Sequence, residues 1–315
     1  ESQYVLVRAS AQKAVKFLWI KLAEGGNTVK DISDLFIKEP DEISWESGNE
    51  DDLFSMHDGS LDKITVAEGA VYPELIRNVR GYGLFNGEIY LLSKSGTIIK
   101  TGYDAKTSTS ILDDPHLGEQ IFGPSGFYQV KVLSDDIILF IGPDGELIAN
   151  HLPYKFVDKG TRGIQFYQEE NKVLIWKKDR IAILDFSAEK TQNTSFEKGP
   201  SMRWIYTEGK DIRNAFWVYE DSHVLFQDGE NVSILGVEEF GVVTLDDVIT
   251  VEKKSNIYFS EGTGLVYFLA SKGKGLFETR IVPEKKLIPV PLPQGGNGSE
   301  DLVITPQGVG GAKGK

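Results

Sequence analysis

The sequence predicts an all-β fold, a β-propeller of seven four-stranded blades. Two observations predict it: a tight turn between two apolar strands recurs along the chain, and its spacing is that of a repeat fold. From Gly59 to Gly275 the turns span 216 residues in five intervals, a mean of about 43 residues. The turns fall at Asp58-Gly59, Ser95-Gly96, Asp144-Gly145, Lys178-Asp179, Asp228-Gly229 and Lys274-Gly275. Glycine in such a pair accepts the positive φ that a two-residue hairpin turn needs.

The two strands that each turn joins differ in character. The strand before the turn is nearly all apolar, as in residues 137–141, and the strand after it alternates more clearly in most pairs, as in residues 231–235. A continuous apolar run indicates a strand covered on both faces, so we place the first strand of each pair deeper in a stack of sheets. A shorter strand precedes each pair, at residues 43–45, 79–84, 128–132, 164–166, 214–217 and 257–259.

A fourth strand with a less regular pattern follows each pair, such as residues 71–76. Four strands in each repeat are typical of a propeller blade. Residues 1–40 supply two more strands, 4–7 and 16–21, which resemble the middle of a seventh blade whose innermost strand is missing or supplied elsewhere. Since a propeller must remove its sheet edges, we expect closure between these strands and residues 286–292. Six blades is the alternative. The clear blades are expected near residues 41–76, 77–119, 120–156, 157–196, 197–245 and 246–293, and one short helical turn near 31–37.

The chain divides into a propeller at residues 1–293 and a Gly-rich tail at 294–315. The tail has seven glycines in 22 residues and no sustained pattern, so we expect it to be disordered. The chain starts at Glu1 with no leader after it, and we interpret it as a processed or excised piece of a longer protein.

Composition excludes several function classes. The net charge is −13, which disfavours nucleic acid and anionic membrane surfaces as partners, since both need clustered Lys and Arg. The absence of cysteine excludes disulfides, thiolate metal sites and a cysteine nucleophile. The longest apolar runs are far shorter than the roughly 20 residues that span a bilayer.

The polar residues that could carry chemistry each have a simpler interpretation. The four histidines are dispersed without metal-binding spacing, and the aspartates that recur in the turns are favoured there by turn chemistry. The acidic stretches 46–52 and 113–114 lack the pattern of a calcium loop and are interpreted as solvated loops. The histidines are His57, His116, His151 and His223, and the turn aspartates are Asp58, Asp144, Asp179 and Asp228.

Other signatures are incomplete. Residues 123–127, Gly-Pro-Ser-Gly-Phe, lack the offset of a nucleophile elbow, and residues 273–276 lack the pattern of a phosphate-binding loop. The tryptophans on strands are expected to pack between blades, whereas two aromatics in a more polar stretch could be exposed. The packing set is Trp45, Trp176 and Trp217; the pair that could be exposed is Trp204 and Tyr206, for which packing against a neighbouring blade is the favoured interpretation. We therefore name no catalytic, metal or cofactor-binding residue, and expect no cofactor.

Three stretches, residues 164–176, 212–226 and 256–269, carry a family likeness. They resemble the propeller-like domain that follows PEGA domains in envelope proteins of small uncultured bacteria and, more distantly, TolB-type and WD40-like propellers. The resemblance implies an extracytoplasmic, anchored binding domain without catalytic residues. No PEGA module is visible, and the Trp-Asp dipeptide that closes WD40 blades is absent.

The function we expect is that of a non-catalytic interaction or scaffold domain that presents loops to a protein or envelope component. Because the surface is acidic, its partners should carry basic patches. Two alternatives stay open. One is a carbohydrate-binding or carbohydrate-active propeller with two carboxyls and exposed aromatics at one end of the axis. The other is a calcium-dependent lactonase-type hydrolase with acidic and amide ligands on the axis.

Overall fold

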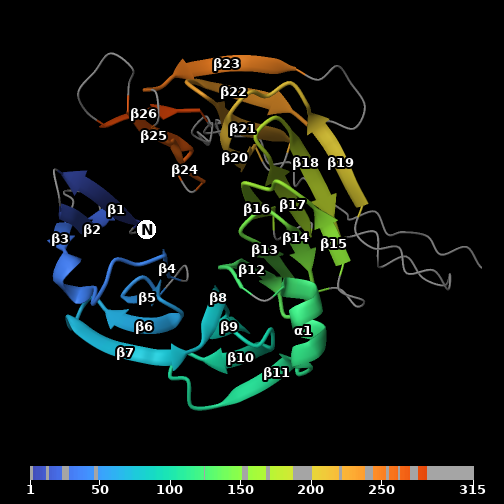
Figure 1. Cartoon of the computed structure of the whole chain (residues 1–315). Helices are drawn as coiled ribbons and strands as arrows, with labels where there is room; N and C mark the ends of the chain where they lie inside the picture. The colour runs from blue at the N-terminus through green and yellow to red at the C-terminus, as the bar shows by residue number, and fades with distance from the viewer. Residues whose placement is uncertain are drawn as a thin grey trace, which may run out of the picture.

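The computed structural model shows seven antiparallel sheets arranged as blades around an axis (Figure 1). It describes residues 3–11, 14–22, 28–45, 49–123, 125–150, 155–167, 171–186, 201–219, 222–237, 244–252, 255–261, 263–269 and 276–281. The seven-bladed prediction is thereby confirmed over the six-bladed alternative.

The strands follow one another along the chain and pair with their neighbours in sequence. The blades are β1–β3 (Gln3–Ala11, Ala14–Leu22, Thr28–Asp31), β4–β7 (Glu42–Ser44, Asp52–His57, Ser60–Thr65, Ala70–Arg77), β8–β11 (Val79–Phe85, Glu88–Ser93, Ile98–Gly102, Ser108–Leu112), β12–β15 (Gln129–Ser134, Ile137–Ile141, Leu147–Ala149, Lys155–Asp158), β16–β19 (Gly163–Tyr167, Lys172–Trp176, Ile181–Asp185, Ser201–Tyr206), β20–β23 (Ile212–Val218, His223–Asp228, Asn231–Gly236, Leu245–Thr250) and β24–β26 (Tyr258–Ser260, Leu265–Leu269, Leu276–Arg280).

The predicted tight turns join the second and third strands of their blades. Asp58 and Gly59 have φ of 50° and 78°, and Gly145 has φ of 77°, so these turns use the left-handed region in which glycine is unstrained. Lys274-Gly275 lies outside the described residues.

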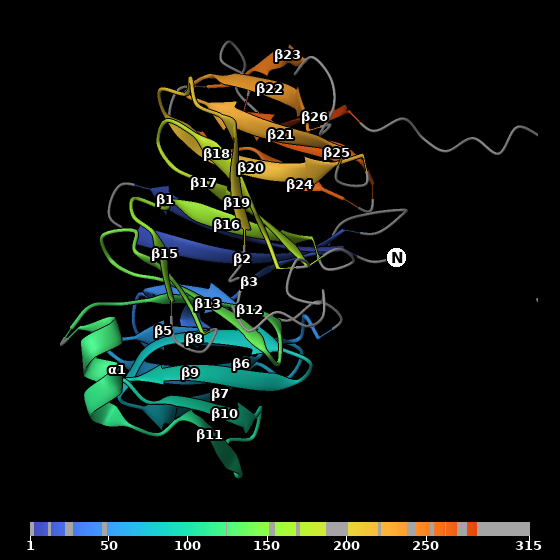
Figure 2. The same ribbon diagram turned by 90° about the vertical axis from the view of Figure 1, so that its right-hand side faces the viewer.

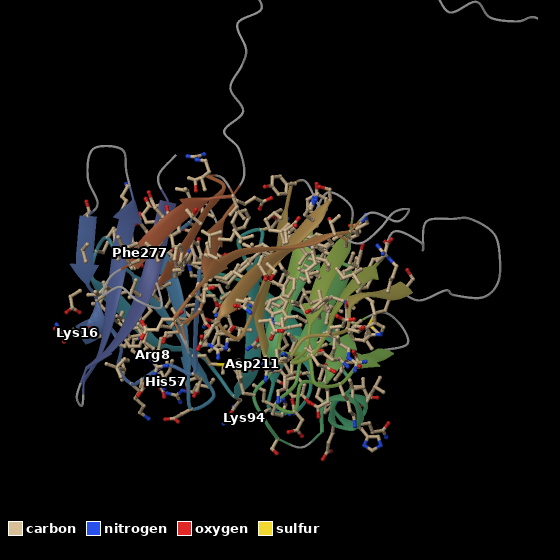
Figure 3. The ribbon with its side chains drawn as sticks, turned by 90° about the horizontal axis from the view of Figure 1, so that it is seen from above. Arg8, Lys16, His57, Lys94, Asp211 and Phe277 are labelled. Atoms are coloured by element: carbon tan, nitrogen blue, oxygen red, sulfur yellow. The ribbon has the colours of Figure 1, made fainter. Side chains whose placement is uncertain are left out.

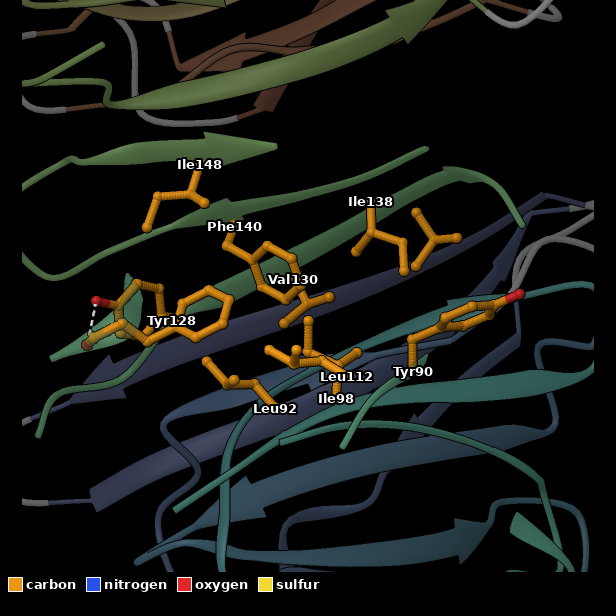
Figure 4. Packing of buried hydrophobic residues seen from close by; sticks show 11 residues of the cluster. Tyr90, Leu92, Ile98, Leu112, Tyr128, Val130, Ile138, Phe140 and Ile148 are labelled. Carbon is orange, nitrogen blue, oxygen red and sulfur yellow. Dashed lines mark hydrogen bonds between the residues drawn. The ribbon is translucent and has the colours of Figure 1, made fainter. Parts of the chain in front are cut away.

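Burial follows the predicted order of the strands in most blades. The strands β9, β13 and β17 are buried along nearly their whole length, whereas β10 has half-buried positions. The third strands β14 and β18 are exceptions, since they are as buried as the second strands β13 and β17. Apolar side chains then interlock between successive blades. Figure 4 shows one such cluster, in which side chains of β9 and β10 pack against those of β12 and β13. Phe122 and Phe140 meet edge to face with ring centroids 4.9 Å apart.

The first blade keeps the predicted irregularity. In Figure 2 the strand β1 starts at the end of the molecule opposite the helix α1 (Pro115–Phe122) and runs toward the α1 end. Arg8, near the finish of β1, pairs with Glu39, and the Asp41 amide donates to the Met56 carbonyl close to the turn at Asp58. The strand β1 therefore corresponds to the second strand of other blades, and no described strand takes the innermost place. The predicted closing segment, 286–292, lies outside the described residues.

Two predictions need correction. The strand β19 (Ser201–Tyr206) is the outermost strand of the β16–β19 blade and does not belong to a blade at 197–245, because it pairs with β18 after a long connection. Residues 113–114 are not only a solvated loop, since the Asp114 side chain accepts hydrogen bonds from the amides of His116 and Leu117 and caps α1, a helix that was not predicted. The short helical turn near 31–37 is confirmed as a 3-10 turn at Ser33–Leu35.

The tail assigned to residues 294–315 lies outside the described residues. Among the helices of the described part of the chain, none has the length and apolar character required to cross a membrane.

Candidate functional site

The structure does not bring the histidines of the described chain together. His57 is buried, and its Nε2 lies 2.8 Å from Oδ2 of the equally buried Asp62. His116 lies on the exposed face of α1 beside Gln120, and His223 contacts the Ser222 hydroxyl. His151 is outside the described residues.

Three of the turn aspartates already hold local partners. Asp58 accepts a 2.7 Å hydrogen bond from Lys38, which lowers the pKa of Asp58, and Asp179 pairs with Arg180 at 2.8 Å. Asp228 accepts from the backbone amides of Lys210 and Asp211. Within the residues described, no three His, Asp or Glu side chains gather as a metal site would require.

The predicted packing of the aromatics is confirmed where the structure describes it. The Trp176 indole donates to the Arg213 carbonyl of the next blade at 2.9 Å, and Tyr206 packs on Phe226 with ring centroids 4.9 Å apart. Trp204 lies beneath the cations of Lys177 and Arg180, 5.1 and 5.3 Å from its centroid. These rings join blades and support surface cations.

The feature that departs most from a plain propeller is the connection between β11 and β12, which carries α1. Arg80, buried at the start of β8, holds this connection in place. Its guanidinium donates to four backbone carbonyls at 2.7–3.0 Å, those of Phe122, Gly123, Ser125 and Gly126. Three of these residues lie in segment 123–127, whose sequence does not fit a nucleophile elbow. In the structure this segment supplies backbone carbonyls that accept hydrogen bonds from Arg80.

Tyr128 also holds this connection, and we call the contacts of Arg80 and Tyr128 with it the clamp. The Tyr128 ring lies 5.1 Å from the Arg80 guanidinium carbon, and its hydroxyl donates to the Phe122 carbonyl at 2.7 Å. Burial is the main cause that lowers the pKa of Arg80 and raises the pKa of Tyr128. A buried charge with this many hydrogen bonds fixes the geometry of the segment it holds.

The helix itself rests on a contact between two glycines. A Cβ added to Gly118 would lie 2.2 Å from the Gly96 carbonyl oxygen, and Gly96 has φ of 83°. The turn between β9 and β10 and the helix can approach this closely only because neither residue has a side chain.

One hollow adjoins the segment that follows this helix, another adjoins the helix itself, and Lys94 lines both. One, of about 320 Å³, is walled by residues that include Asp41, Arg80 and Phe127; the other, of about 410 Å³, by residues that include His116 and Glu119. Lys94 is exposed, and it forms no ion pair with any residue that the structure describes. Figure 3 shows Lys94 and His57 toward the end of the molecule that carries the helix. We call Lys94, α1 and the two hollows the α1 site.

Several other charges at this end are paired. Asp211, for example, accepts hydrogen bonds from Arg162 at 2.8 Å and Arg213 at 2.9 Å, which lowers its pKa. Lys94 is an exposed cation that lines both hollows, and its charge contributes to the lowered pKa of Asp58 in one of them. The sequence signal for the site was Asp114-Pro115, an N-cap followed by proline at the first helical position.

Comparison with known proteins bears on the fold. No protein-family model and no curated protein sequence matches the chain. A chain of the mitotic checkpoint complex is 12% identical with a TM-score of 0.56, and covers 90% of this chain and 87% of that one. The β-propeller domain of Cps50 (Swd1) from Myceliophteria thermophila is 11% identical with a TM-score of 0.53, and covers 84% of this chain and 94% of that one. The chain is a seven-bladed β-propeller with WD40-like neighbours.

A further neighbour belongs to a longer protein. PorZ of Porphyromonas gingivalis, a bacterial surface component of the type-IX secretion system, is 14% identical with a TM-score of 0.46. The match covers 80% of this chain and only 34% of PorZ, so the chain spans about a third of that protein.

Proposed function

We propose that this propeller is a non-catalytic interaction domain that binds a protein through its α1 site, as part of a bacterial envelope or surface protein. The observation that carries the proposal is the clamped helix. A buried arginine with four carbonyl contacts holds an exposed, structured insertion, and the exposed Lys94 lines the hollow beside it.

The surface around the helix has the composition of a protein contact. Leu117 on α1 is 40% exposed, and Ile111 near the finish of β11 is 37% exposed. The two hollows of the α1 site contain charged and aromatic side chains. Apolar side chains ringed by polar groups on a rigid support are typical of interaction surfaces. A neighbour of the same fold is found in the mitotic checkpoint complex, a multiprotein assembly, which supports an interaction role.

The envelope location is supported by the resemblance of three strand segments to PEGA-associated propellers. Cell fractionation followed by antibody detection tests it, and we expect the protein with the envelope fraction. Recovery in the cytosolic fraction alone would overturn this part of the proposal.

The carbohydrate alternative has one matching feature. Asp41 and Asp58 line the smaller hollow together with Phe127, although Asp58 is paired with Lys38 and the Asp41 carboxylate accepts from the Asp58 amide at 3.3 Å. A glycan array with the wild-type protein distinguishes this alternative, and Asp41→Asn would abolish any binding that uses this hollow.

The main test is affinity capture from an envelope extract with matched variants. We expect one protein to be enriched by the wild type and to fall about tenfold with Leu117→Asp or Lys94→Glu, since either change alters the proposed contact. The matched control is Leu245→Asp, because Leu245 is 47% exposed on β23, a different blade. Equal capture by wild type and both α1-site variants would contradict the proposal.

A further inference from the structure

A third hollow lies between the β4–β7 and β8–β11 blades, at the far end of the molecule from α1. Its volume is about 690 Å³, within the range of ligand-binding clefts. The strand β6 runs from the turn at Gly59 to Thr65, so the two ends are separated by roughly 20 Å. We call this hollow the tyrosine groove. The lining residues that matter below are Asp51, Glu68, Tyr72, Leu75, Tyr103 and Asp104.

The groove carries surplus negative charge. Asp52 at its base is neutralised, since it pairs with Lys63 at 3.0 Å and accepts from the Thr65 hydroxyl at 3.0 Å. Asp104 pairs at the surface with Lys106 at 3.1 Å. For Asp51 and Glu68, both exposed, the described part of the chain contains no cationic partner. Two carboxylates thus remain for a ligand.

Aromatic and apolar side chains line the same groove as these carboxylates. The Tyr72 side chain is 49% exposed, and Leu75 lines the wall beside it. Tyr103 is held by Phe54, which is fully buried, with ring centroids 4.8 Å apart. A fixed ring and an exposed ring flanked by acids match a planar cation that stacks and donates hydrogen bonds at once.

We propose that the tyrosine groove binds an arginine-bearing extended segment of a partner protein. The guanidinium group stacks on the tyrosine rings and donates to the Glu68 or Asp51 carboxylate, and the aliphatic part of the segment packs on Leu75. The chain's net charge of −13 draws such a segment in. This proposal does not depend on the α1 site, because the two surfaces lie at opposite ends.

Fluorescence polarisation tests it on the full chain with a labelled peptide in which arginine and leucine alternate. We expect saturable binding of the peptide, with an affinity that weakens as salt is raised. The affinity should fall about tenfold with Glu68→Lys and severalfold with Tyr72→Ala. The lysine version of the peptide should bind more weakly, and the glutamate version should not bind.

The control variants match in chemistry and exposure. Tyr258 is 48% exposed on β24, and Glu230 is exposed in the turn between β21 and β22, so Tyr258→Ala and Glu230→Lys should bind the peptide as the wild type does. If the control variants lose as much peptide affinity as the groove variants, the groove is not the binding site. Equal binding of the arginine and lysine peptides, or no binding of either, would overturn the arginine assignment. Leu117→Asp leaves peptide binding unchanged, which separates this test from that of the α1 site.

Discussion

At the scale of single residues, the most unusual group is the carboxyl of Glu42 on the innermost strand β4. Its Oε2 is buried without a hydrogen-bond partner in the described structure, and burial raises the pKa of Glu42 from 4.5 to about 7, with Lys131 opposing the change. No sequence pattern around Glu42 predicts this, because Lys131, whose charge lowers that pKa, and Tyr82, whose own pKa the Glu42 carboxylate raises, come from other blades.

The shift has a definite consequence for stability against pH. The folded protein holds the Glu42 proton more tightly than the unfolded chain, so ionisation disfavours folding as pH rises from about 4.5 through about 7. Glu42→Gln removes the ionisation and should raise the free energy of unfolding by about 2–3 kcal/mol at pH 8, with almost no effect at pH 4. Urea unfolding at both pH values measures it.

The control for this substitution is Glu119→Gln, an exposed carboxyl on α1, which should leave stability unchanged at both pH values. A Glu42→Gln variant less stable than the wild type at pH 8 would show that the carboxylate is stabilised by contacts we have not recognised.

At the scale of elements, strands and turns could be predicted from the sequence, and connections could not. Alternation and Asp-Gly pairs are local signals, so the strands predicted at 137–141 and 231–235 match β13 and β22 to within one residue, whereas the strand predicted at 4–7 ends four residues before β1 does. The helix α1 was missed because it is eight residues long and is held by Arg80, far away in sequence. The strand β19 was assigned to the wrong blade because the connection before it lengthens one repeat.

The contact between Gly118 and Gly96 gives a prediction at this scale. In an isolated helix Gly→Ala stabilises by about 1 kcal/mol, but here the new Cβ would lie 2.2 Å from the Gly96 carbonyl oxygen. We expect Gly118→Ala to destabilise the protein by about 1–3 kcal/mol and to speed amide exchange in residues 115–122. Hydrogen exchange read by mass spectrometry measures both the size and the location of the effect.

Glu119→Ala, one residue further along and exposed, is the matched control and should stabilise slightly or have no effect. A stabilising Gly118→Ala would mean that the helix moves away from the turn at little cost, and that the glycine contact does not set its position.

At the scale of the whole molecule, the described core consists of six apolar clusters, each shared by two successive blades. Repetition made this arrangement predictable: a blade cannot bury both faces alone, so equal spacing of the strands implies a stack. The candidate surfaces were not predictable, because the α1 site and the tyrosine groove each combine side chains from neighbouring blades that no motif links. The predicted acidic character of the surface does reappear in the groove, as Asp51 and Glu68.

Because successive blades share apolar clusters, a substitution that weakens one blade interface should also lower the stability of distant blades. Phe226 on β21 is 1% exposed in the cluster between the β16–β19 and β20–β23 blades. Phe226→Ala should lower the free energy of unfolding by about 3–5 kcal/mol, whereas Phe277→Ala, at a 43% exposed site, should cost less than about 1 kcal/mol. Because each blade loses a neighbour when the next one opens, amide exchange should rise even around Phe17, across the ring. Tryptophan fluorescence and far-UV circular dichroism should give one coincident denaturant midpoint. Exchange that rises only in residues 163–250, with Phe17 still protected, would instead show that the blades unfold separately and that the ring does not act as one cooperative unit.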